Sequence, residues 1–177
     1  MEFALSSIVL LLLAMGLLDL SRAFYFGVSI QGAAREGARH AAWFDTPSRL
    51  NTYLSDNEVI TTVNQALAGS GMTGTFRAQP NCLAGTDGNT QNNPPYPSSA
   101  YPGTYNAPNV YACYTRGSDG YQTGSLLSRP ANNDWRLGDV NVQILLSYGL
   151  ITGFMQNVIG NFIQIPVNAH FTIQGRP

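Results

Sequence analysis

The chain opens with residues 1–19, MEFALSSIVLLLLAMGLLD, and this stretch decides how the rest can be arranged. The carboxylate of Glu2 is followed by sixteen uncharged residues, Phe3 to Leu18, before the next carboxylate at Asp19. A secretory signal has a different polarity, because it begins with basic residues and ends at a small-residue cleavage site. A carboxylate in or beside hydrocarbon is costly when isolated, so the sequence predicts a partner or a function for Glu2.

Residues 2 to about 43 are predicted to form one continuous helix, which makes residues 1–43 a segment separate from the globular part, residues 44–177. The first half of this helix is apolar on nearly all sides, as in a membrane or a filament core. At about 1.5 Å per residue the helix would be about 60 Å long, roughly twice the thickness of a bilayer core. Its first half can therefore lie in lipid while its second half enters a soluble domain.

Small residues recur at four-residue spacing in the second half of the predicted helix. They form two series, Ala33, Gly37, Ala41 and Ala34, Ala38, Ala42. Such spacing favours close approach of another helix. Two interpretations stay open, contact with copies of the chain or packing on the protein's own sheet, and both can hold on different faces. Asp19 and Arg22, three residues apart, are predicted to pair on the same helix.

The rest of the chain predicts an α+β fold with a small antiparallel sheet. A second helix is expected to start at Thr46-Pro47, to continue from Arg49 to about Ala68 with an interruption near residues 55–58, and to end at Gly69-Ser70-Gly71. Strands are expected at Thr75 to Gln79, Val110 to Thr115, Asp139 to Tyr148 and Ile163 to Ile173. The last has alternating apolar and polar residues over its whole length, which indicates one buried and one wet face. Pro166 cannot donate to a ladder, which favours an edge position or a bulge for this strand.

Residues 83–108 are rich in Gly, Asn, Pro and Tyr and predict a long surface excursion. The two cysteines, Cys82 and Cys113, flank it, and an exported protein favours a disulfide between them over two buried thiols. A disulfide that closes this loop would add about 3–4 kcal/mol to the free energy of unfolding in the chain-entropy model. Three tyrosines of the excursion are candidates for surface recognition, because tyrosine joins apolar area to a polar tip. They are Tyr96, Tyr101 and Tyr105, and the alternative is that they pack the loop onto its own domain.

Composition argues against several classes of function. The net charge is −1 and lysine is absent, which disfavours nucleic-acid binding and excludes a P-loop or Schiff-base lysine. The two histidines, His40 and His170, lie far apart in the sequence without a supporting acid or nucleophile motif, so solvated surface positions are favoured over catalysis. We expect no enzyme activity, no cofactor and no metal site.

The N-terminal pattern resembles the TadE-like pilins and pseudopilins of tight-adherence pili, which are related to type IVb pili. The resemblance covers about the first 42 residues and rests on residues 2–5 (EFAL), 19–25 (DLSRAFY) and 33–39 (AAREGAR). It implies a prepilin peptidase, and such pilins are cut a few residues before the glutamate. Only Met1 precedes Glu2 here, which leaves three alternatives: a leader outside this numbering, a cut before Met1, or no cut.

The resemblance implies a structural subunit that waits in the cytoplasmic membrane and then joins a helical homo-oligomeric filament at the cell surface. The filament would serve adhesion or surface motility, and the partners would be a Tad-type secretion ATPase, a membrane platform and the peptidase. Glu2 is expected to pair with an N-terminal amine or another donor of a neighbouring subunit, the alternative being contact with lipid headgroups. The residues expected to act in assembly are Glu2, Phe3, Asp19, Arg22, Ala33, Gly37 and Ala41. A membrane-anchored extracytoplasmic binding protein that does not polymerise is the alternative function, and an anchored enzyme is a distant third.

Overall fold

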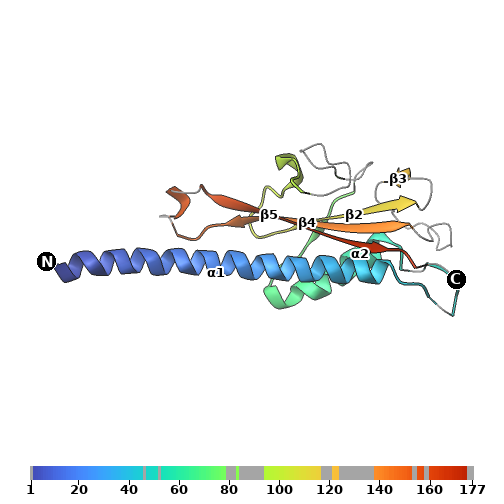
Figure 1. Ribbon diagram of the computed structural model, residues 1–177, viewed down its shortest axis with the longest axis horizontal. Helices are drawn as coiled ribbons and strands as arrows, with labels where there is room; N and C mark the ends of the chain where they lie inside the picture. The colour runs from blue at the N-terminus through green and yellow to red at the C-terminus, as the bar shows by residue number, and fades with distance from the viewer. Residues whose placement is uncertain are drawn as a thin grey trace.

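The computed structural model describes residues 2–45, 47–51, 53–78, 83, 94–116, 121–123, 138–152, 155–157 and 160–174. It has one long helix whose carboxyl-terminal half lies along a small sheet, while the amino-terminal half projects beyond the sheet (Figure 1). The predicted α+β fold class is therefore confirmed.

Helix α1 (Glu2–Ala41) is continuous over forty residues, close to the predicted range. Among the described residues, Ser6–Ala41 is the segment long and apolar enough to cross a membrane, as judged by length and composition alone. The most apolar window of this segment is only 11% buried within the chain. The fold itself therefore leaves most of this apolar stretch of α1 uncovered.

The sheet contains β1 (Thr75–Phe76), β2 (Asn109–Arg116), β3 (Tyr121–Thr123), β4 (Asp139–Gly149) and β5 (Phe162–Thr172). Its order is β1-β2-β4-β5, with β3 paired to β2, and the pairs β2–β3, β2–β4 and β4–β5 are antiparallel. The pair β1–β2 is parallel, so the sheet is mixed rather than antiparallel as predicted. The reason is the connection, because the long segment between β1 and β2 returns the chain to the same end of the sheet before β2 starts.

The main core lies between the sheet and one face of α1. From α1 it receives Ala23, Phe26, Ile30, Ala34 and Ala38, and from β4 it receives Val140, Val142, Ile144, Leu146 and Tyr148. The predicted inner face of β4 is thus confirmed. Ile163, Ile165 and Val167 of β5 pack against the same core, and β5 lies at the end of the strand order, as Pro166 predicts.

Helix α2 (Asp56–Leu67) is shorter than the predicted second helix and starts ten residues later than Thr46. The residues before it form a tight turn instead, closed by bonds from Asp45 N to Leu50 O and from Arg49 N to Asp45 O, with Arg49 at φ 58°. Thr46 lies outside the described residues. The predicted helix over Pro47 and Arg49 is wrong, because a left-handed residue cannot continue a right-handed helix. The buried face of α2 packs against α1 and consists of Val59, Val63 and Leu67.

The outer face of the sheet is covered by the described part of the excursion. Tyr96 and Ala100 pack on Tyr111 and Leu145 in a second, smaller core. The hydroxyl of Tyr111 donates to Ala100 O at 2.6 Å, and Ser147 Oγ donates to Pro102 O at 2.8 Å. Residues 94–108 are therefore a covering layer of the sheet and contain a short 3-10 turn, Ser98–Ala100.

Candidate functional site

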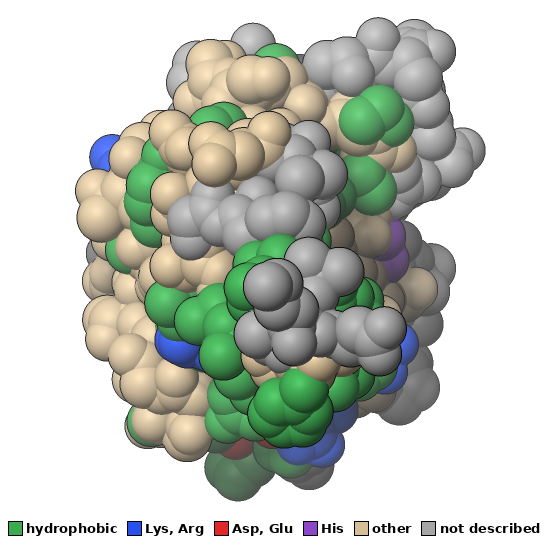
Figure 2. All heavy atoms as spheres, turned by 90° about the vertical axis from the view of Figure 1, so that its left-hand side faces the viewer, with side chains coloured by type: hydrophobic (Ala, Val, Ile, Leu, Met, Phe, Trp, Pro, Cys, Tyr) green, Lys and Arg blue, Asp and Glu red, His purple; other side chains and the backbone are tan. Residues whose placement is uncertain are grey.

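The amino-terminal half of α1 exposes large apolar side chains on all of its sides. Figure 2 looks toward this end of the molecule and shows hydrophobic side chains gathered over the helix. Because no single face is polar, a helix of this kind is stable only when other apolar matter surrounds it. The most exposed of these side chains, each more than half accessible, are Phe3, Ile8, Val9, Leu10, Leu11, Leu13, Leu17, Leu18 and Leu20.

Glu2 and Phe3 lie at the start of this surface. Glu2 is the first residue of α1, and its side chain lies outside the described part of the structure. Phe3 is 87% exposed and extends from the helix into open space. The structure thus places both residues at the free end of α1, far from the sheet (Figure 1).

Asp19 of α1 is hydrogen-bonded to the loop between β4 and β5. Its carboxylate is 2% exposed and accepts hydrogen bonds from Ile151 N at 3.1 Å, from Thr152 N at 3.0 Å and from the Thr152 hydroxyl. Ile151 and Thr152 belong to the loop between β4 and β5, more than 130 residues away in the sequence. Hydrogen bonds to an ionised carboxylate are stronger than neutral ones, so this contact ties the loop to α1.

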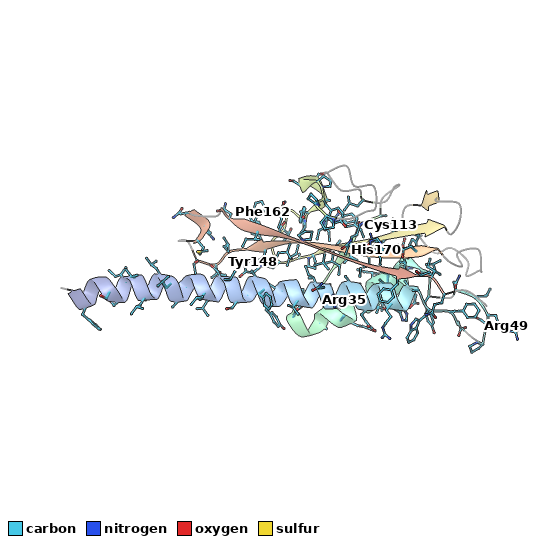
Figure 3. All side chains as sticks on the ribbon, viewed as in Figure 1. Arg35, Arg49, Cys113, Tyr148, Phe162 and His170 are labelled. Atoms are coloured by element: carbon cyan, nitrogen blue, oxygen red, sulfur yellow. The ribbon has the colours of Figure 1, made fainter. Side chains whose placement is uncertain are left out.

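Arg22, the predicted partner of Asp19, lies close enough for the two charges to interact electrostatically. Its guanidinium carbon lies 5.9 Å from the centre of the Phe26 ring, and the side chain is exposed. The tilted Phe26 ring lies 5.7 Å from the ring of Tyr148, which β4 directs toward α1 (Figure 3). Burial, followed by the neighbouring Asp19 carboxylate, raises the pKa of the Tyr148 hydroxyl. The junction is therefore an aromatic contact beside a buried carboxylate.

Two hollows flank this junction. One, of about 450 Å³, is lined by Met155 of the β4–β5 loop and by α1 residues Val9, Leu12, Leu13, Gly16, Leu17 and Leu20. The other, of about 370 Å³, is lined by Met15, Leu18, Asp19, Arg22, Ile151 and Thr152. The first is almost wholly apolar, and a Cβ at Gly16 would lie 3.6 Å from the Met155 sulfur. The loop thus forms one wall of an apolar groove along the projecting half of α1.

The small residues farther along α1 lie inside the protein's own core. Ala33, Ala34, Ala38, Ala41 and Ala42 are each at most 2% exposed. At Gly37 an added Cβ would lie 2.6 Å from Val63 Cγ2, so this glycine allows α2 to approach. Of the two open interpretations, the structure favours packing within the subunit at these positions.

The opposite face of the same half of α1 is open. An added Cβ at Gly32 meets nothing within 4 Å, and Phe24 and Val28 are 73% and 52% exposed. Farther on, Arg39 Nη2 lies 2.6 Å from a Glu36 carboxylate oxygen. The apolar surface of α1 therefore extends on this face from Phe3 to Val28 and is followed by a charged end.

The three candidate tyrosines differ in their surroundings. Tyr96 is 5% exposed and belongs to the outer core, where burial raises its pKa. Tyr101 is half-buried beside that core, and Tyr105 is 46% exposed with its ring 5.8 Å from that of Phe162. The alternative interpretation, in which these rings pack the loop onto the domain, suits Tyr96. Only Tyr105 of the three keeps enough free surface for recognition.

Cys113 is buried on β2, 1% exposed, and is not a free thiol. Cys82 lies outside the described residues, so the predicted bond between Cys82 and Cys113 stays a prediction. Within the described part of the chain, no group of three or more His, Cys, Asp or Glu side chains is placed to hold a metal ion.

Sequence reasoning missed the contact between Asp19 and the β4–β5 loop. The sequence did contain one signal for a distant partner. The Asp19 carboxylate ends an apolar helical stretch and needs hydrogen-bond donors, and Arg22 on the same helix supplies only an exposed contact. Nothing in the sequence identified Ile151 and Thr152 as those donors. Their backbone N–H groups come together only when the hairpin folds back on α1.

A family model described as TadE-like protein matches residues 1–39. No curated protein matches the chain. No solved structure matches it either. The predicted resemblance is thus confirmed for the segment that contains most of α1, and a TadE-like match together with an apolar N-terminal helix fits a protein related to Tad pili.

Proposed function

We propose that this chain is a pilin, a structural subunit that polymerises through the apolar half of α1 into a Tad-type pilus filament. The observation that carries the proposal is the exposed apolar surface of residues 3–20 on a helix that matches the TadE-like model. Burial of apolar surface contributes about 25 cal/mol per Å² removed from water. A helix that is apolar on all sides can bury its surface only among lipids or among other apolar helices.

Before assembly, the subunit is held in the cytoplasmic membrane by α1, with the sheet domain outside. Assembly then needs a prepilin peptidase and a pilus machinery, and the product lies at the cell surface, where it serves adhesion or motility. Within lipid the hydrophobic gain from helix pairing is small, so close packing and the machinery must drive the transfer. The role is structural rather than catalytic.

Glu2 and Phe3 are the proposed contact between copies at the membrane end of α1. An isolated carboxylate in an apolar bundle is costly, so Glu2 would pair with an N-terminal amine or another donor of the next subunit. Phe24 and Val28 extend the available apolar face toward the sheet domain. The small residues Ala33, Gly37 and Ala41 support this assembly indirectly, since they hold the domain on α1.

The test is site-specific photocrosslinking in cells that carry a complete Tad export machinery. A photoreactive residue replaces Leu13, 60% exposed on α1, or Leu50, 37% exposed in the turn at the far end of the domain. We expect a ladder of homo-oligomers from Leu13 in filaments sheared from the cell surface, and none from Leu50. Glu2→Gln combined with the Leu13 reporter should weaken the ladder.

If both reporters give only monomers although the protein reaches the membrane, the pilin proposal fails and the anchored, non-polymerising binding protein takes its place. If the Leu13 ladder is unchanged by Glu2→Gln, polymerisation stands and the role of the Glu2 charge is wrong.

A further inference from the structure

We propose that the tip of the β4–β5 hairpin, residues 150–152 and 155, docks on the bilayer that holds α1 and serves as a second membrane contact. This inference rests on the membrane-held stage of the proposed function. The hairpin tip is the part of the sheet domain that reaches farthest toward the amino terminus of α1 (Figure 1).

The first step is the depth at which the tip must lie. About twenty helical residues cross a bilayer core about 30 Å thick. Counted from Phe3, such a length ends near Arg22, whose exposed side chain can extend to the headgroups. Asp19 falls inside this length and holds Ile151 and Thr152 through three hydrogen bonds. The hairpin tip must therefore lie at the same depth in the bilayer as Asp19.

The second step is that the surface of the tip suits lipid. Ile151 is 59% exposed, and Met155 closes the apolar groove of about 450 Å³ along Val9 to Leu20. The sequence from residue 140 to residue 175 contains no Asp, Glu, Lys or Arg. The hairpin segment itself therefore brings no formal charge to the interface, and the Asp19 carboxylate beside it is already 2% exposed.

The third step is that the polar groups of the tip already have partners. Gln156 N donates to Thr152 O, Gln156 Nε2 donates to Leu150 O at 2.8 Å, and Leu150 N donates to Asn161 O. The N–H groups of Ile151 and Thr152 are taken by Asp19. Backbone can approach hydrocarbon when its hydrogen bonds are satisfied within the protein, and this loop meets that condition at these groups.

A second copy of the chain is the other occupant that the apolar groove could accept. Lipid is favoured because the tie at Asp19 fixes the tip at the membrane boundary of its own helix, before any neighbour arrives. On the side of the apolar groove, the surface of the tip also continues that of the candidate span, since Met155 and Leu17 line the same groove.

The experiment is tryptophan quenching by brominated phosphatidylcholine with the full chain reconstituted at low protein-to-lipid ratio. In a Trp43→Phe, Trp135→Phe background, a single reporter is placed by Leu11→Trp, by Ile151→Trp or by Leu50→Trp. All three side chains are exposed aliphatics, 57%, 59% and 37% accessible. We expect Leu11→Trp to be quenched best by deep bromines, Ile151→Trp by shallow bromines, and Leu50→Trp by neither.

If Leu11→Trp is quenched while Ile151→Trp behaves like Leu50→Trp, the tip does not touch lipid and the inference fails, although the membrane stage stands. If none of the three is quenched, the membrane stage itself fails. If Ile151→Trp is not quenched at low protein-to-lipid ratio and its emission shifts to shorter wavelength only in crowded membranes, the tip contacts a second copy and the lipid assignment is overturned. Met155→Trp is a second reporter on the same tip, and unchanged thermal unfolding shows for each variant that the domain is intact.

Discussion

The two halves of α1 form one continuous helix but differ in what surrounds them. In the first half, large aliphatic side chains point in every direction, and the chain covers few of them. In the second half, alanines and Gly37 form an inner face that the sheet and α2 approach closely. The outer face of this half is open, with Phe24 and Val28 exposed and a charged end farther on. Side-chain size on the inner face therefore decides which half joins the domain and which half needs other molecules. Three variants, each with a matched control, test this division.

The largest effect is expected from a charge in the first half of α1. Leu10→Arg replaces a side chain that is 67% exposed, and an arginine at the centre of a membrane helix costs about 2.5–3.5 kcal/mol on insertion scales. We expect loss of the chain from the membrane fraction and from sheared filaments. The matched control is Gln31→Arg, on the exposed face of the second half, which should leave both fractions unchanged. Equal losses from the two variants would show that the halves do not differ in this way.

The second effect concerns packing within the domain. Gly37→Leu places its first side-chain atom 2.6 Å from Val63 Cγ2, and overpacking of this kind should lower the free energy of unfolding by about 3 kcal/mol. Gly32→Leu lies on the same helix with open space around it, and should be neutral or slightly stabilising because leucine is the better helix former. Chemical denaturation in detergent, followed by near-ultraviolet circular dichroism, measures both.

A contrary result would be informative for this pair. If Gly37→Leu unfolds like the parent protein while Gly32→Leu prevents filament formation, the contact between copies lies on the outer face and the inner face tolerates bulk.

The smallest effect is expected at the boundary between the two halves. Asp19→Asn keeps the shape of the side chain but removes the charge of the carboxylate, which accepts three hydrogen bonds from Ile151 and Thr152. Since bonds to charged groups contribute about 1.5–3 kcal/mol, amide hydrogen exchange at these two residues should accelerate about tenfold or more, with little change at the centre of β4. Asp139→Asn is the control, because Asp139 lies at the far end of β4 in an exposed contact with His170 Nδ1 at 2.8 Å. Unchanged exchange at Ile151 would show that the tie contributes little.

The sequence predicted the elements whose pattern is local. The apolar run of residues 3–18, the alternation from Ile163 to Ile173 and the inner face of Val140 to Tyr148 each express a single period, so α1, β5 and β4 were found close to their true bounds. The turn at residues 47–50 was missed because Thr46-Pro47 matches a helix start in the sequence. The competing hydrogen bonds of Asp45 with Arg49 and Leu50 have no comparable sequence pattern. The parallel pairing of β1 depends on the path of a connection of more than thirty residues, which local propensity does not encode.

By itself the sequence determined that this protein has a long apolar helix, a resemblance to TadE-like pilins over that helix, and a small sheet domain without the motifs of an enzyme. The tertiary structure alone decided what each part of the helix touches. It buried Ala33, Gly37 and Ala41 against the protein's own α2 and sheet, and it brought the Asp19 carboxylate to two backbone N–H groups more than 130 residues away. The physical reason is that hydrophobic periodicity fixes which face is buried, whereas the partner of that face is fixed only when distant segments satisfy each other's shape and hydrogen bonds.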